Sequence, residues 1–114
     1  MIYRIAEAED WLAARRSGHF ASADLALEGF IHCSEYNQIL ATGERYYKGQ
    51  AGLTLLEIDE TKIAPIVKRE MAASRNEMFP HIFAPIPLAA IVRHFDFLAD
   101  ADGRFALPAA LLGM

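Results

Sequence analysis

The stretch that decides the fold class is Leu53-Thr54-Leu55-Leu56-Glu57-Ile58. It is apolar on both faces apart from Thr54 and Glu57, and this pattern is typical of a strand that is covered on two sides. We therefore expect a central strand here. The sequence on either side of it supplies further strands and helices.

On the N-terminal side of the central strand, the sequence predicts alternating strands and helices. Gly18 and Gly29 each follow a helical segment and predict its end, because glycine adopts the left-handed conformation of a helix C-cap at little cost. Glu9 and Asp10 suit the positive end of the first helix dipole. The expected segments are strands at residues 2–5 and 30–33, helices at 8–17 and 35–47, and a helical turn at 22–27 with Ser22 as its N-cap.

On the C-terminal side, the sequence predicts strands and loops. Asp102-Gly103 is typical of a tight hairpin turn, whereas residues 71–80 show no clear period and predict a loop. The expected strands are residues 66–70, 91–98 and a short segment around 105–107. Because the sequence shows no repeat, linker or low-complexity segment, we expect one α+β domain over residues 1–114.

Composition narrows the possible partners. The chain is 54% hydrophobic and 23% charged, which is typical of a soluble globular domain. A net charge of −4 argues against a protein whose main role is to cover nucleic-acid phosphates. Lys68, Arg69 and Arg75 still form a local basic patch, so nucleic acid is not excluded as a partner, although a solvated face is the more common role of such a patch.

Cys33 is the only cysteine, so no internal disulfide forms and a reducing compartment is expected. The N-terminus has acidic residues where a signal peptide would have a long apolar stretch. No apolar run approaches the roughly 18 to 20 residues needed to span a bilayer. We expect a cytoplasmic protein with no membrane partner.

Two runs carry the candidate chemistry, Glu28-Gly29-Phe30-Ile31-His32-Cys33-Ser34 and Phe79-Pro80-His81-Ile82-Phe83-Ala84-Pro85. Each places an imidazole in an apolar segment framed by glycine or proline, where burial costs free energy unless the ring has a partner. We therefore expect the functional site between His32 and His81. The other two histidines, His19 and His94, lack such framing and are expected at the surface.

In the first run, strand alternation places Ile31 and Cys33 on one face and His32 and Ser34 on the other. If the first pair enters the core, His32 faces a cleft. Ser34 has two compatible roles, the N-cap of the following helix and a contact to a ligand hydroxyl or phosphate. Cys33 is expected in the core rather than as a nucleophile, because no neighbouring cation in the sequence would lower its pKa.

In the second run, Pro80 and Pro85 restrict the backbone on either side of His81. This stiffness suits a binding residue and equally suits a rigid turn that closes a sheet. Glu70 and Glu77 are the acidic candidates. Either carboxylate can orient an imidazole, bind a ribose hydroxyl or act as a general base, and either can simply be solvated.

Several common sites are not expected. His32 and Cys33 are adjacent on a strand and point to opposite faces, and the sequence contains no spaced ligand pair, so we expect no metal. The phosphate-loop, dinucleotide-fold and nucleophile-elbow motifs are absent from the sequence as well.

The chain resembles the domain of unknown function 952 family. The resemblance rests on the two histidine runs, the N-terminal Ile-Tyr strand, Trp11, Leu55 to Asp59 and Glu70. The resemblance covers essentially the whole chain. It implies an ADP-ribosyltransferase-like fold, in which two small, mostly antiparallel sheets with flanking helices enclose a cleft for NAD. The tRNA 2′-phosphotransferases share that fold.

The resemblance also implies roles for individual residues. His32 with Ser34 would hold the ribose and nicotinamide of NAD, which would be a substrate rather than a resident cofactor. His81 would face them across the cleft, and Glu70 or Glu77 would stabilise positive charge on the ribose. Arg4 would meet the pyrophosphate.

The chain departs from the family in one loop, because Phe83-Ala84-Pro85 stands where the family usually has Tyr-Gly-Pro. Phe83 lacks the tyrosine hydroxyl, and Ala84 adopts positive φ less readily than glycine.

Two hypotheses follow. An enzyme acting on NAD, ADP-ribose or a phosphorylated ribose requires both histidines and one glutamate in one pocket. The second hypothesis is a non-catalytic small-molecule or nucleotide-binding module, or a purely structural relative in which backbone carbonyls satisfy the histidines. It predicts that no carboxylate lies within hydrogen-bonding distance of either imidazole.

Overall fold

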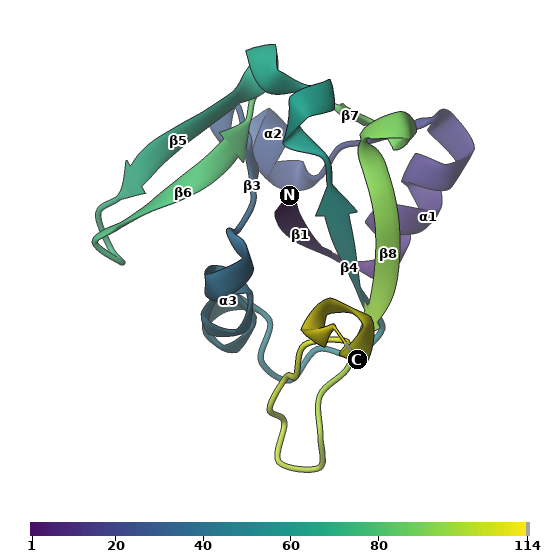
Figure 1. Cartoon of the computed structure of the whole chain (residues 1–114), viewed down its shortest axis with the longest axis vertical. Helices are drawn as coiled ribbons and strands as arrows, with labels where there is room; N and C mark the ends of the chain where they lie inside the picture. Colours follow the sequence, from purple (N-terminus) through teal and green to yellow (C-terminus); the bar gives the residue numbers. More distant parts are fainter. Residues whose placement is uncertain (114) are drawn as a thin grey trace.

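Two three-stranded antiparallel sheets form the framework of the protein, and the computed structural model describes residues 1–113 (Figure 1). The first sheet has the order β1-β4-β8 and the second the order β3-β6-β5, and a two-stranded sheet, β2-β7, accompanies them. The strands are β1 (Ile2–Ala6), β2 (His19–Phe20), β3 (Ile31–His32), β4 (Leu53–Ile58), β5 (Val67–Ala72), β6 (Glu77–Ile82), β7 (Ile86–Pro87) and β8 (Ile91–Phe97). The α+β class expected from the sequence is confirmed.

The helices lie around these sheets (Figure 1). They are α1 (Ala8–Ser17), α2 (Ala23–Glu28) and α3 (Ile39–Tyr46), and short 3-10 turns lie at Tyr36–Gln38, Glu60–Lys62, Ala64–Ile66, Leu88–Ala90 and Ala109–Leu112. Gly18 and Gly29 end α1 and α2 in the left-handed conformation, as predicted. In the described part of the chain, no helix has the length and apolar character needed to cross a membrane.

Strand β4 lies in the middle of the first sheet and contacts both parts of the core. Leu56 and Ile58 pack in one buried cluster, which also contains Phe20, Ile31 and Ile82, while Leu53 and Leu55 pack in a second cluster with Ile39 and Phe97. Because successive side chains of a strand point to opposite faces, a strand between two clusters must be apolar on both. This confirms the central strand predicted from residues 53–58.

The two large sheets meet where β1 passes the end of β3. The backbone N–H of Tyr3 donates to the carbonyl of Ser34 at 2.9 Å, and the N–H of Ser34 donates to the carbonyl of Tyr3 at 2.7 Å. These two bonds place Arg4 of β1 beside His32 of β3, although the two residues are far apart in the sequence.

The expected loop at residues 71–80 is wrong. Strand β5 continues to Ala72 and β6 begins at Glu77, so only residues 73–76 form a turn, in which Asn76 has a φ of 51°. The β5–β6 hairpin extends from the body of the molecule (Figure 1). Its outer positions, including Met71 and Met78, are exposed, so no apolar alternation marked these strands in the sequence.

Two further expectations differ from the structure. Strand β3 is shorter than residues 30–33, because Pro80 lies opposite Cys33 and has no N–H to donate, although its carbonyl accepts the Cys33 N–H at 3.0 Å. The last expected strand, around residues 105–107, is only a single bridge between Ala99 and Phe105.

Candidate functional site

His32 and His81 lie directly opposite each other across the antiparallel pair β3–β6. Side chains of opposed residues point to the same face of a sheet, and here the two imidazole ring centroids are 5.4 Å apart with an interplanar angle of 72°. Both rings line one cleft with a volume of about 690 Å³. Strand pairing therefore brings together the two histidines that the sequence singled out.

Asp24 holds the imidazole of His32. Its Oδ2 lies 2.9 Å from His32 Nδ1 and also accepts the His32 backbone N–H at 2.9 Å. Sequence reasoning missed this residue. Its only signal was an acidic side chain in the first turn of a short helix, where such residues are common because they suit the helix dipole.

The same carboxylate is also the partner of Arg4. Arg4 Nη1 donates to Asp24 Oδ2 at 2.8 Å and to the carbonyl of His32 at 2.9 Å, and the Arg4 side chain is only 8% exposed. Burial raises the pKa of the Asp24 carboxyl, but the hydrogen bond from His32 and the charge of Arg4 outweigh burial and hold that pKa well below its ordinary value. Arg4 is thus engaged inside the protein, where it supports the strand that carries His32.

Glu70 holds the imidazole of His81 in the same way. Its Oε1 lies 2.8 Å from His81 Nδ1, and the hydrogen bond from His81 lowers the pKa of the Glu70 carboxyl. Because both Asp24 and Glu70 are ionised, each can only accept, so each Nδ1 carries the proton. When such an imidazole is neutral, its Nε2 is the acceptor, and Glu28 Oε2 lies 3.7 Å from Nε2 of His32.

The two glutamates named from the sequence lie in different places. Glu70 of β5 reaches His81, whereas Glu77 begins β6 at the far end of the hairpin and accepts a hydrogen bond from Gln38 Nε2 at 3.1 Å. The structure therefore places Glu70, and not Glu77, beside the two histidines. The Lys68 ammonium is 3.8 Å from the other oxygen of Glu70.

An aromatic side chain covers the pair of imidazoles. The ring of Phe30 stacks on His81, with centroids 3.9 Å apart and an interplanar angle of 16°, and is tilted against His32 at 4.8 Å. Phe83, at the position where a tyrosine is usual, packs its partly exposed ring against Phe30 at 5.6 Å. Phe30 thus limits the movement of the imidazoles, and Phe83 supports Phe30.

Ser34 is not the N-cap that the sequence predicted. The cap position is Glu35, whose backbone N–H donates to Gln38 Oε1 at 2.9 Å, while the buried Ser34 hydroxyl donates to Thr42 Oγ1 at 3.2 Å. Cys33 is buried, and burial raises the pKa of its thiol to about 12. Cys33 packs in the buried cluster that contains Ile31 and Ile82, so its expected place in the core is confirmed.

The charges along the cleft are unevenly distributed. Four acidic residues and two arginines line it: Glu7, Asp10, Asp24, Glu28, Arg4 and Arg75. Of the basic patch seen in the sequence, Arg69 pairs with Glu35 and Glu60 at the surface, and only Arg75 lines the cleft. Over residues 1–113, no three histidine, cysteine or acidic side chains are grouped as metal ligands would be. His19 and His94 are exposed, as predicted.

The geometry bears on the two hypotheses. The binding-module hypothesis predicted that no carboxylate would lie within hydrogen-bonding distance of either imidazole, and distances of 2.9 Å to Asp24 and 2.8 Å to Glu70 show that this prediction is wrong. Both histidines line one cleft, and Glu70 contacts His81 without lining the cleft itself. Activity itself stays a prediction.

The fold and the site define an α+β domain whose two small antiparallel sheets present a cleft with two carboxylate-bound histidines. The chain belongs to the family described as "Protein of unknown function (DUF952)", which matches residues 5–94, so the family membership expected from the sequence is confirmed.

Solved structures of one bacterial protein are similar to this chain over nearly its whole length. The crystal structure of protein CC0527 from Caulobacter crescentus is 32% identical, with a TM-score of 0.88 over 99% of this chain and 98% of that one. The solution NMR structure of the same protein has a TM-score of 0.83 over 99% and 97% of the two chains, also at 32% identity. No curated protein matches the chain.

Proposed function

We propose that the cleft binds a nucleotide of the NAD or ADP-ribose class, or another phosphorylated ribose, and that the domain is an ADP-ribosyl- or phosphotransferase-like enzyme with the corresponding fold. The observation that supports this most is the pair of opposed imidazoles, each tied at Nδ1 to an ionised carboxylate. We also propose a cytoplasmic location, because the single buried cysteine suits a reducing compartment.

The imidazole pair suits a ribose for reasons of hydrogen bonding. Neighbouring sugar hydroxyls each donate and accept, and two Nε2 atoms on rings 5.4 Å apart offer two acceptors that are already oriented. The carboxylates of Asp24 and Glu70 and the ring of Phe30 fix these rings before the ligand arrives. Binding then requires little further ordering of side chains.

The same groups suit a transfer at the ribose. When the bond between C1′ and the nicotinamide nitrogen breaks, the leaving group takes the electron pair and positive charge develops on the sugar. An acceptor hydroxyl then bonds to C1′, and its proton passes to Nε2 of His81. Glu70 stabilises the resulting imidazolium through Nδ1, so Glu70 acts as a positioning residue behind His81.

A non-catalytic nucleotide-binding module is the second candidate, and one observation favours it. Each carboxylate beside the imidazoles already has a partner in the protein: Asp24 contacts Arg4 and His32, Glu70 contacts His81, and Glu28 lies 3.7 Å from Nε2 of His32. In that case the histidines recognise the ligand without moving a proton.

An NMR titration tests the proposal. Imidazole resonances of the full chain are followed during addition of NAD, ADP-ribose and a 2′-phosphorylated dinucleotide. The titration is done with the wild type, with His32→Ala and with the control His19→Ala. His19 suits the control because its ring is exposed and does not line the cleft. We expect His32 and His81 to shift together, and the binding to disappear only in His32→Ala. Silence at millimolar ligand contradicts the proposal. Binding without release of nicotinamide from NAD, and without phosphate transfer from the dinucleotide, identifies the binding module.

A further inference from the structure

Arg75 reaches the cleft from the turn between β5 and β6 and is held there on three sides. Its guanidinium carbon lies 4.3 Å from the ring centroid of Phe79 and 5.9 Å from that of Tyr46. Its Nη1 donates to Thr42 Oγ1 of α3 at 2.8 Å. Cation–π contacts and a hydrogen bond thus orient a guanidinium that a turn would otherwise leave free in solvent.

Arg75 also differs from its neighbours in charge pairing. Arg4, the other arginine of the cleft, has its partner in Asp24, while Lys68 and Arg69 from the same basic patch face Glu70 and Glu35, respectively. No carboxylate of residues 1–113 lies within ion-pair distance of Arg75. Its positive charge is therefore available to an anion that enters the cleft.

The hydroxyls of Thr42 and Ser34 supply a second donor at the same place. Thr42 Oγ1 accepts a hydrogen bond from Arg75 Nη1 and lies 3.2 Å from the Ser34 hydroxyl. Either hydroxyl can donate in the Ser34–Thr42 pair, so their shared bond uses only one of the two protons. The other O–H of the pair is left for an acceptor, because no other hydrogen bond among the described residues uses it. An unused O–H beside an unneutralised guanidinium is a pair of donors that suits an oxyanion.

Arg75 and Thr42 lie beside residues that are two positions from the histidines along the chain. Phe79, which supports Arg75, is two residues before His81 on β6 and on the same face, so their Cα atoms are about 6.5–7 Å apart. Ser34 likewise comes two residues after His32. That separation suits a sugar at the imidazoles and its phosphate at the arginine.

We propose that Arg75 and Thr42 form a phosphate subsite, so that the ligand is a nucleotide carrying a phosphate or pyrophosphate and not a free nucleoside. The position of the sugar beside the imidazoles rests on the function proposed above. The subsite does not depend on that function, because it binds inorganic phosphate without a sugar. The resemblance to the family implied Arg4 as the pyrophosphate contact. Because Asp24 neutralises Arg4, the structure supports Arg75 in that role.

The test is an NMR titration of the labelled full chain with inorganic phosphate, ADP-ribose and adenosine, following the Arg75 side-chain N–H and the Thr42 amide. We expect phosphate to shift both signals. Arg75→Gln should remove that response and weaken ADP-ribose binding about 10- to 100-fold, because it loses a charge-assisted hydrogen bond. Adenosine binding should not change. Thr42→Val, which retains the shape of the side chain, should weaken ADP-ribose binding by a smaller factor.

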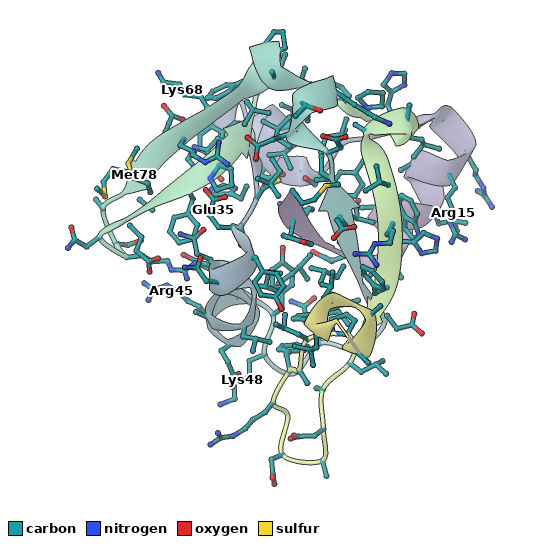
Figure 2. The ribbon with its side chains drawn as sticks, viewed as in Figure 1. Arg15, Glu35, Arg45, Lys48, Lys68 and Met78 are labelled. Carbon is teal, nitrogen blue, oxygen red and sulfur yellow. The ribbon has the colours of Figure 1, made fainter. Side chains whose placement is uncertain are left out.

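Arg45→Gln is the matched control. Arg45 lies 5.7 Å from the same Tyr46 ring, between α3 and the β5–β6 hairpin, and does not line the cleft (Figure 2). Arg45→Gln removes one positive charge close to Arg75 and should change the affinity for ADP-ribose less than twofold. Equal effects of Arg75→Gln and Arg45→Gln would show a general field effect and overturn the subsite.

The outcomes separate the two proposals. If His32→Ala abolishes ADP-ribose binding while Arg75→Gln binds like the wild type, the subsite is wrong and the proposed function stands. If phosphate shifts Arg75 and Thr42 while no nucleotide shifts His32, the subsite stands and the proposed function is wrong. A wild-type protein that responds to neither ligand contradicts both.

Discussion

Replacing Asp24 with asparagine removes the only carboxylate within ion-pair distance of Arg4 among the described residues and leaves a buried cation without compensation. The two side chains are 8% and 13% exposed, for Arg4 and Asp24 respectively, so solvent screens the pair weakly. Removing one partner of a buried pair costs about 3–5 kcal/mol. Arg4 keeps its bond to the His32 carbonyl and an amide oxygen can still accept, so we expect a loss of about 3 kcal/mol in the free energy of unfolding.

Urea denaturation at pH 7, followed by circular dichroism, measures this loss, and a double-mutant cycle assigns its cause. In an Arg4→Met background no charge is left to compensate, so Asp24→Asn should cost about 1 kcal/mol or less, the value of ordinary hydrogen bonds. Asp96→Asn, an exposed change on β8, serves as the control and should stay within about 0.5 kcal/mol. Equal costs of Asp24→Asn in both backgrounds would refute the role of the Arg4 charge.

Three further predictions concern single residues. The pKa of Asp24 is lower in the folded than in the unfolded state, so its contribution to the free energy of unfolding is full above about pH 5 and declines as the pH falls. The stability of the wild type, measured as the pH is lowered, should show this decline, and that of Asp24→Asn should show less of it. In Gly43→Ala the new Cβ lies 3.1 Å from the stacked rings of Phe97 and Phe105, so thermal unfolding should show a net loss of about 1 kcal/mol despite the better helix propensity of alanine. Mass spectrometry should find native Cys33 resistant to iodoacetamide at pH 8 and modified only after unfolding, since its thiol is buried with a pKa of about 12; rapid native modification would contradict this burial.

The elements that the sequence predicted well are those with a local cause. Residues 8–17 carry helical spacing and end at Gly18, whose φ of 89° suits glycine, so the boundaries of α1 could be predicted without any tertiary contact. The apolar run at 53–58 likewise required burial on both faces. The expected loop at 71–80 failed because the exposed β5–β6 hairpin depends on pairing between strands more than on an apolar pattern.

The site residues also separate into those that the sequence could identify and those that only the fold reveals. Unusual local framing identified His32 and His81, because an imidazole in an apolar run needs a partner wherever the chain folds. The partners themselves were not visible in the sequence. Asp24 resembled an ordinary first-turn acid, and Glu70 could not be told from Glu77 until the register of β5 against β6 placed one beside His81 and the other beside Gln38.

The sequence by itself determined the α+β class, the central strand, helices α1 and α2 with their glycine ends, the family and the two histidines. Each of these depends on residue type and on spacing within one segment, which act before distant segments meet. Only the tertiary structure decided which carboxylate holds each imidazole, that Asp24 neutralises Arg4, and that Arg75 stays unneutralised. Hydrogen bonds and ion pairs act over a few ångströms, so the pairing of β3 with β6 and of β1 with the end of β3 had to form before those partners could be named.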